Sequence, residues 1–140
     1  MDVVHRAYLL KHRLWVPAQV VVSDWTHHNV KIFTRDGTAA KHTYSGVQGA
    51  PDAQLKAPMG VAWDGRNHVF IVDGKTAKLH AVSTQSGQCS AIFSLPQVTG
   101  SELKLVTFVE ASPDLCRNER ALVVTTTCGG IQVYDLCSSF

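Results

Sequence analysis

The hydrophobic residues of this chain recur mostly with a period of two, in short runs separated by turn-forming residues. The runs are rich in Val, Ile, Thr and aromatic residues, and Gly, Asp, Asn, Ser or Pro lies between most of them, which is typical of β-strands and turns. The stretch closest to a helical period, residues 3–15, is also interpreted as a strand, because its spacing before Val20 fits an earlier strand of the same pattern. Further strands are predicted at residues 20–23, 30–33, 60–64, 69–73, 79–83, 91–95, 103–109, 122–126 and 131–134.

The clearest repeating unit lies in the middle of the chain. The Asp64-Gly65 pair marks a hairpin turn, because Gly tolerates positive φ at low cost. The strand that follows, residues 69–72, is apolar throughout, as expected for a strand buried on both faces. Asp73 then opens a polar gap, and two further runs follow. Four antiparallel strands with the inner ones most buried describe a propeller blade.

Two other parts of the chain repeat this unit with a period near 50 residues. Asp24 corresponds to Asp73, a spacing of 49 residues, and residues 122–135 repeat the strand–gap–strand part with Thr125 in the place of the acid. Such periods are typical of solenoids, propellers and arrays. The sequence therefore predicts one all-β domain, a partial β-propeller of about three four-stranded antiparallel blades. Its approximate boundaries are residues 1–140 for the domain and 1–45, 46–98 and 99–140 for the blades.

The middle unit resembles the NHL repeat, whose blade combines a Pro-x-Gly-Val/Ile-Ala-x-Asp segment with a strand ending in Asp. The matching residues are Pro58, Gly60, Val61, Ala62, Asp64, Val69, Phe70 and Asp73. The resemblance extends well over residues 15–95 and loosely over 103–136, although Asn67-His68 replaces the usual Gly-x. It implies a non-catalytic binding module, as found after the RING, B-box and coiled-coil segments of tripartite-motif proteins. The expected role is substrate recognition for a ubiquitin ligase whose chemistry lies outside this chain.

Three blades do not close a ring, since propellers usually have four to eight. The two terminal faces would leave large side chains in water, at roughly 1.5–3 kcal/mol for each. We expect the chain to be part of a longer protein, with the missing blades of a six-blade ring upstream of Met1. The alternative is that a second copy completes the six blades.

The composition narrows the class of protein without naming its activity. Apolar residues make up 45% of the 140 residues, enough to bury a core, and the net charge of +2 is too small to indicate nucleic acid by itself. The four Cys, at positions 89, 116, 128 and 137, form no C-x-x-C pair and are expected to be reduced. No signal-peptide core or membrane-length apolar run is recognised, so we expect a cytoplasmic protein.

The candidate binding residues are those that the propeller pattern places in loops on one face. The first unit contributes Trp25, Thr26, His27 and His28; the second contributes Lys56, Lys75, Thr76 and Lys78; the third contributes Thr126, Thr127 and Cys128. A protein partner or ubiquitination substrate is the preferred ligand. Single-stranded RNA is the alternative, because Lys contacts phosphate and Trp stacks on bases.

Catalytic and metal-binding readings find little support. Asp24 and Asp73 recur at the same place in their units, which favours carboxylates that accept backbone N–H bonds in a turn. His27-His28 point apart on extended backbone and imply no third ligand, and His80 is expected to be half-exposed. The chain has no G-x-S-x-G motif and no Gly-rich phosphate loop. We therefore expect no cofactor, no metal and no enzyme activity, with a metal-dependent lactonase or lyase kept as a third class.

Overall fold

The computed structural model describes residues 4–10, 19–34, 36–64, 67–96, 103–110, 120–127 and 129–135. Within this part the chain forms three antiparallel sheets and one short 3-10 helix, η1 (Pro51–Ala53). The first sheet has the order β1-β2-β3-β4, from β1 (Val4–Leu10), β2 (Gln19–Asp24), β3 (Asn29–Phe33) and β4 (Ala40–Tyr44). The second has the order β5-β6-β7-β8, from β5 (Pro58–Trp63), β6 (His68–Asp73), β7 (Lys78–Ser83) and β8 (Cys89–Ser94).

The third sheet has three strands in the described part of the chain, where four were predicted. Its order is β11-β10-β9, from β9 (Leu103–Glu110), β10 (Arg120–Thr126) and β11 (Ile131–Asp135). The nine strands predicted from the alternating runs are all present within a few residues, and residues 3–15 contain β1 as expected. β4 was missed, because Lys41 and Thr43 are exposed and only Tyr44 is buried, so that the strand has little apolar signal.

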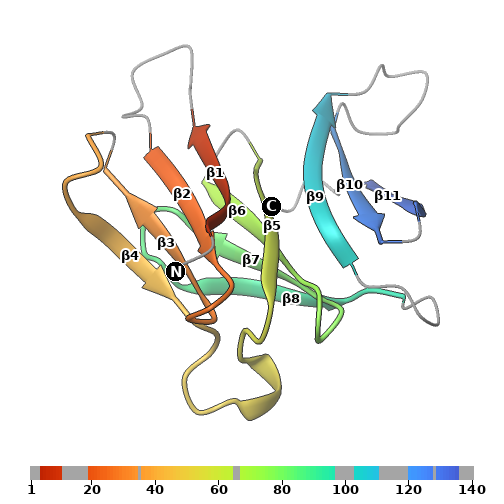
Figure 1. Cartoon of the computed structure of the whole chain (residues 1–140), viewed down its shortest axis with the longest axis horizontal. Helices are drawn as coiled ribbons and strands as arrows, with labels where there is room; N and C mark the ends of the chain where they lie inside the picture. The colour runs from red at the N-terminus through yellow and green to blue at the C-terminus, as the bar shows by residue number, and fades with distance from the viewer. Residues whose placement is uncertain are drawn as a thin grey trace.

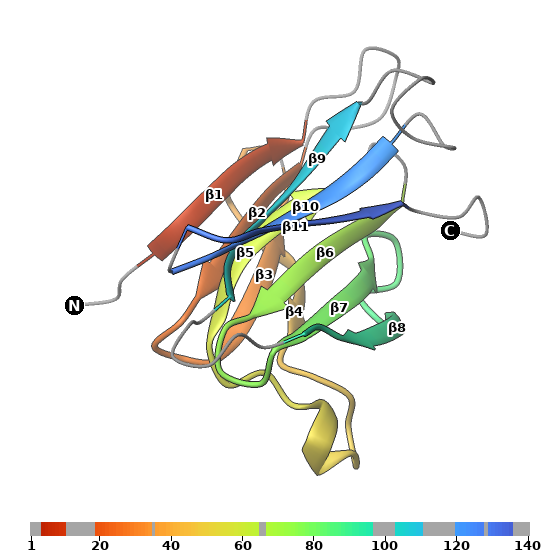
Figure 2. The same ribbon diagram turned by 90° about the vertical axis from the view of Figure 1, so that its right-hand side faces the viewer.

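The sheets lie side by side, each meandering outward from one inner strand (Figure 1). β5 packs against both β1 and β9, so the three inner strands are neighbours. Figure 2, viewed from the side of the third sheet, shows the sheets layered one behind another. This arrangement, in which each sheet covers a face of the next, is that of propeller blades around an axis.

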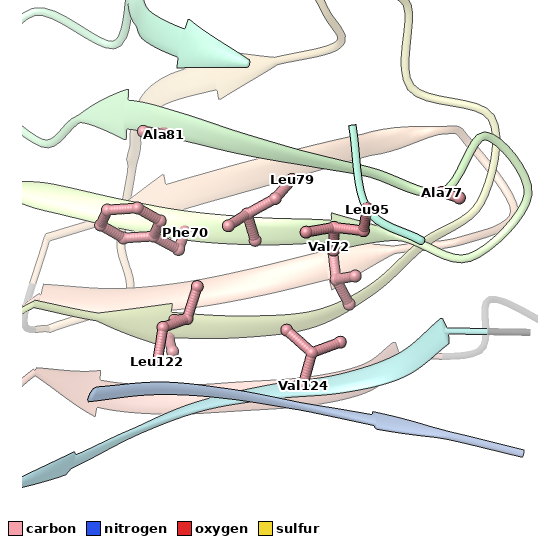
Figure 3. Close-up of a cluster of buried hydrophobic side chains, with 9 residues drawn as sticks. Phe70, Val72, Ala77, Leu79, Ala81, Leu95, Leu122 and Val124 are labelled. Atoms are coloured by element: carbon pink, nitrogen blue, oxygen red, sulfur yellow. The ribbon is translucent and has the colours of Figure 1, made fainter. Parts of the chain in front are cut away.

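The second sheet is buried on both faces because its strands alternate between two neighbours. Val69 and Ile71 of β6 belong to a cluster with the first sheet, whose members are Val21, Val30, Ile32, Tyr44, Leu55, Val61, Val69, Ile71 and Val82. Phe70 and Val72 point the other way, toward Leu122 and Val124 of β10 (Figure 3). This second cluster also includes Ala62, Ala77, Leu79, Ala81 and Leu95. The continuously apolar run at 69–72 is therefore explained, as predicted, by burial on both sides.

Candidate binding face

The turns that follow the second strand of each sheet lie at corresponding ends of the three sheets, and those after β2 and β6 are seen in the lower half of Figure 1. Strand register fixes this geometry, because the last residue of each second strand pairs with the start of the inner strand. Asp24 pairs with Val4, Asp73 with Pro58 and Thr126 with Leu103. The linker between the first two sheets ends at the same place. We call residues 25–28, 45–57, 74–77, 127 and 129–130 the loop face.

Asp73 organises the middle of the loop face. Its carboxylate is fully buried and accepts backbone N–H bonds from Lys56 (2.6 Å), Ala57 (3.1 Å), Lys75 (3.0 Å) and Thr76 (3.1 Å). Two of these donors belong to the linker and two to the β6–β7 turn, so one side chain ties both segments together. With its oxygens occupied by four donors, the carboxylate has the structural role that its recurrence suggested.

Asp24 holds the equivalent turn of the first sheet with fewer bonds. Its oxygens accept the backbone N–H of His27 at 3.0 Å and contact the His27 ring Nδ1 at 2.7 Å. Burial alone would raise the pKa of Asp24, but the His27 backbone and ring, together with the charge of Lys31, hold that pKa below its ordinary value. The His27 ring is thus hydrogen-bonded to Asp24, and His27 and His28 lie in a turn and not on the extended backbone that the sequence predicted.

The two turns also share one backbone conformation. The last turn residue has positive φ in both, 56° at His28 and 54° at Ala77, although neither residue is Gly. Left-handed backbone costs roughly 1–2 kcal/mol for such residues, so its recurrence shows that the turn is imposed by its surroundings. This local identity is strong structural support for the repeat.

The third turn departs from this pattern and corrects one prediction. It is one residue shorter, and the hydroxyl of Thr126, not that of Thr125, accepts the backbone N–H of Gly130 at 2.9 Å. The left-handed position falls on Gly129, with φ of 80°. A comparison of the three sequences without gaps places Thr125 opposite Asp24 and Asp73. Because the third turn has one residue fewer, the equivalent position in the second strand is Thr126.

The linker is a compact loop and not a loose connection. An isolated bridge joins Gly46 to Gln54, and the Gln54 side chain donates to the carbonyl oxygens of Val47 and Ala50. Gly46 has a φ of 126°, and an added Cβ would meet the carbonyl oxygen of Ala53 at 2.4 Å, so this close approach requires Gly. The loop face is thus built from internally bonded segments.

The predicted binding residues differ in how far the structure exposes them. Trp25 is 45% exposed, and the exposed side chains around the face also include Thr26, His27, His28, Lys56, Lys75 and Thr127. Thr76 is half-buried and Thr126 is buried, whereas Lys78 donates through Nζ to the carbonyl oxygen of Asp52. The Ser23 hydroxyl donates to the Met59 carbonyl oxygen at 2.8 Å, which places the end of β2 beside the start of β5. Cys128 lies outside the described residues.

Sequence reasoning was wrong about His80, which is fully buried. Its Nδ1 lies 2.7 Å from the Tyr44 hydroxyl oxygen, and the two rings meet edge to face across the first and second sheets. Burial lowers the pKa of His80 to about 4, with the charge of Lys78 acting in the same direction and that of Asp73 opposing. Burial also raises the pKa of Tyr44 above its ordinary value, and the neighbouring Cys89 adds to the rise. A sequence signal existed, since Leu79 to Val82 has no charged residue and lies in a blade covered on both faces.

Comparison with known proteins supports the fold. No family model and no curated protein matches the chain. The crystal structure of BBS1N in complex with ARL6DN is similar, with a TM-score of 0.64 and 19% identity over 94% of this chain. A catalytically inactive variant of virginiamycin B lyase from Staphylococcus aureus, solved with quinupristin, has a TM-score of 0.54 and 15% identity over 88% of this chain. The chain is thus a partial β-propeller, spanning 34% and 39% of those two chains.

Two further observations concern the described residues only. No group of three or more His, Cys, Asp or Glu side chains is arranged there to hold a metal ion. The same part of the chain has no helix with the length and apolar character needed to cross a membrane.

Proposed function

We propose that this chain is a non-catalytic β-propeller module that binds a protein partner through its loop face. The observation that carries the proposal is the set of four backbone N–H bonds on buried Asp73, which fixes the linker and the β6–β7 turn in one shape. Loops held on a rigid scaffold are where binding residues are commonly found. Fixed loops also lose little conformational entropy when a partner binds.

The side chains displayed on this face suit a protein ligand. Trp25 is large and exposed, and Trp is enriched among the residues that contribute most to protein–protein binding. Lys56 and Lys75 are exposed in the other two segments of the loop face and add positive charge to it, which favours a partner with an acidic surface. A similar propeller, BBS1N, was solved in complex with ARL6DN, which supports the use of this fold for a protein partner.

The NHL resemblance supports a finer proposal, in which the partner is a ubiquitination substrate in the cytoplasm. In that account the propeller belongs to a tripartite-motif-type ligase and selects the substrate, while a RING domain outside this chain performs the transfer. The discriminating observation is the reading frame around these 140 residues, which would then encode RING, B-box and coiled-coil segments. A frame without them would overturn the ligase proposal and leave the binding module.

Single-stranded RNA is the alternative ligand for the same face, favoured by the combination of exposed Trp25 with Lys56 and Lys75. RNA affinity would fall steeply with salt because phosphate contacts release counterions. A lyase or lactonase is not favoured, because the two candidate carboxylates, Asp24 and Asp73, are engaged in the turns.

The test places a photo-cross-linking amino acid at Thr26, and separately at Gln85 in the β7–β8 turn at the opposite end, and irradiates cells producing each variant. We expect a discrete cross-linked polypeptide from position 26 that is lost with Trp25→Ala and absent from position 85. Equal products from both positions would contradict the loop face as the binding site.

The RNA alternative is tested in parallel with a labelled single-stranded oligonucleotide of mixed sequence at low and physiological salt. Salt-sensitive binding that is weakened by Trp25→Ala and Lys75→Ala, without a protein cross-link, would replace the protein partner with RNA. No oligonucleotide binding at low salt would exclude RNA from this face.

A further inference from the structure

The outer face of the third sheet presents an exposed aliphatic surface. Ile131 and Val133 of β11 are 69% and 59% exposed, and they share a face because they are two residues apart. The register places them opposite Thr125 and Val123 of β10, which are half-buried. We call these four residues the outer face of the third sheet. Clusters of exposed aliphatic side chains indicate contact surfaces more often than single ones do.

The corresponding positions are buried in the other two sheets. Ile131 and Val133 are equivalent to two residues in the third strand of the first sheet and two in the third strand of the second sheet, when positions are counted from the turn. In both of those sheets the equivalent residues contact the sheet that follows in the chain. They are Val30 and Ile32 in the first sheet and Leu79 and Ala81 in the second, all no more than 2% exposed. The outer face of the third sheet therefore carries the residue types that a following blade covers elsewhere in the molecule.

The first sheet, which is the other outermost sheet of the three, presents a complementary face. In the first sheet, Val20, Val22, Lys31 and Phe33 point away from the second sheet and are half-buried. We call them the outward face of the first sheet. Their counterparts in the second sheet are Val69, Ile71, His80 and Val82, of which the three aliphatic residues pack against the first sheet. The outward face therefore has the form of a blade surface that receives a preceding blade.

Lys31 lies at a position where the other two sheets carry a polar residue that bonds to the preceding sheet. It occupies the position of His80, which is bonded to Tyr44 of the first sheet. The same position in the third sheet is Gln132, which donates through Nε2 to the carbonyl oxygen of Pro96, just after β8, at 3.1 Å. A preceding blade would give Lys31 an equivalent acceptor.

We propose that the outer face of the third sheet binds the outward face of the first sheet in a second copy of this chain. Two such contacts, related by a two-fold axis, would close one ring of six blades, within the four to eight that propellers contain. Each contact would repeat a packing that the chain already makes twice internally. The assembly does not depend on the loop face or on its ligand.

Sedimentation velocity of the 140-residue chain tests the assembly. We expect a concentration-dependent species of twice 15.3 kDa at micromolar concentration. Val133→Asp should raise the dissociation constant by at least about 100-fold, because an unpaired charge in an apolar contact is costly. The matched control is Ser94→Asp, an exposed position on β8 outside both faces, which should leave the dissociation constant unchanged. A monomer at every concentration, or equal dissociation constants for Val133→Asp and the unmodified chain, would overturn the proposal.

Cross-linking between two differently marked copies identifies which faces meet and does not require the Asp variant to fold. Chains with Val133→Cys and chains with Val22→Cys are oxidised alone and after mixing, with the unmodified chain as background for its native Cys. A disulfide-linked dimer that forms above background only in the mixture is expected. A dimer from Val133→Cys alone, or none from the mixture, would contradict the contact between the third and first sheets.

Discussion

The second and third sheets use the same repeat in different surroundings. Leu79 and Ile131 occupy equivalent positions, yet Leu79 is 2% exposed and Ile131 is 69% exposed. The second sheet lies between two neighbours and contributes to both apolar clusters, whereas the described third sheet has one neighbour. Burial in this fold is therefore decided by the adjacent blade more than by the local sequence, as expected for repeats that contact only their neighbours.

The largest effect that separates the two sheets is expected from a charge in the doubly covered strand. Ile71→Asp should cost more than about 5 kcal/mol and remove the cooperative unfolding transition, because the carboxylate would be buried without a partner. Thermal unfolding followed by circular dichroism measures this. A soluble protein with an unchanged melting temperature would contradict the burial of β6.

The turn acids offer a comparison between blades at the loop face. Asp73→Ala should cost about 4 kcal/mol, because four backbone N–H groups, one buried and three partly buried, lose a charged acceptor, and Asp24→Ala about 1 kcal/mol. Urea denaturation gives both values. Equal losses would show that the linker bonds to Asp73 do not contribute to stability.

The equivalent residues Leu79 and Ile131 should differ in their contribution to the free energy of unfolding. Leu79→Ala should lower the free energy of unfolding by about 3 kcal/mol, and Ile131→Ala by less than about 0.5 kcal/mol when measured at concentrations where the chain is monomeric. Comparable losses would mean that Ile131 is covered within one chain.

The contact between the first and second sheets should respond to pH through His80. Its folded pKa is about 4, below the ordinary 6.5, so the unfolded chain binds the proton first as pH falls. The contribution of neutral His80 is complete above pH 6.5 and is lost progressively toward pH 4. Between pH 7 and pH 5 this amounts to about 2 kcal/mol.

His80→Gln tests that assignment with the residue found at the equivalent position, Gln132. This variant should remove the His80 component of the pH dependence between pH 7 and pH 5, measured by urea denaturation at several pH values. An unchanged pH slope would show that another group is responsible.

The strand pattern could be predicted from the sequence because alternation and turn residues are local signals. The role of Asp73 was also predictable, since an acid recurring before a polar gap has a simple local explanation. Three features were not: β4, whose Lys41 and Thr43 face water; the burial of His80, which depends on Tyr44 of another sheet; and the shorter third turn, which moved the capping hydroxyl to Thr126. Each depends on solvent exposure, on contact with another sheet or on the length of a turn, and the alternation of apolar and polar residues does not indicate these. For the candidate site, the repeat pattern predicted which loops share a face. The exposure of each side chain could not be predicted, because it depends on packing between the sheets.

The central claim is that the sheets stack as blades, so that Phe70 of the second sheet packs with Leu122 of the third (Figure 3). A double-mutant cycle of Phe70→Ala and Leu122→Ala, measured by urea denaturation, tests it most directly. We predict a coupling of about 1 kcal/mol, with additive effects for Val21→Ala and Leu122→Ala, which belong to different clusters. Additive effects of Phe70→Ala and Leu122→Ala would contradict the stacking of these two blades.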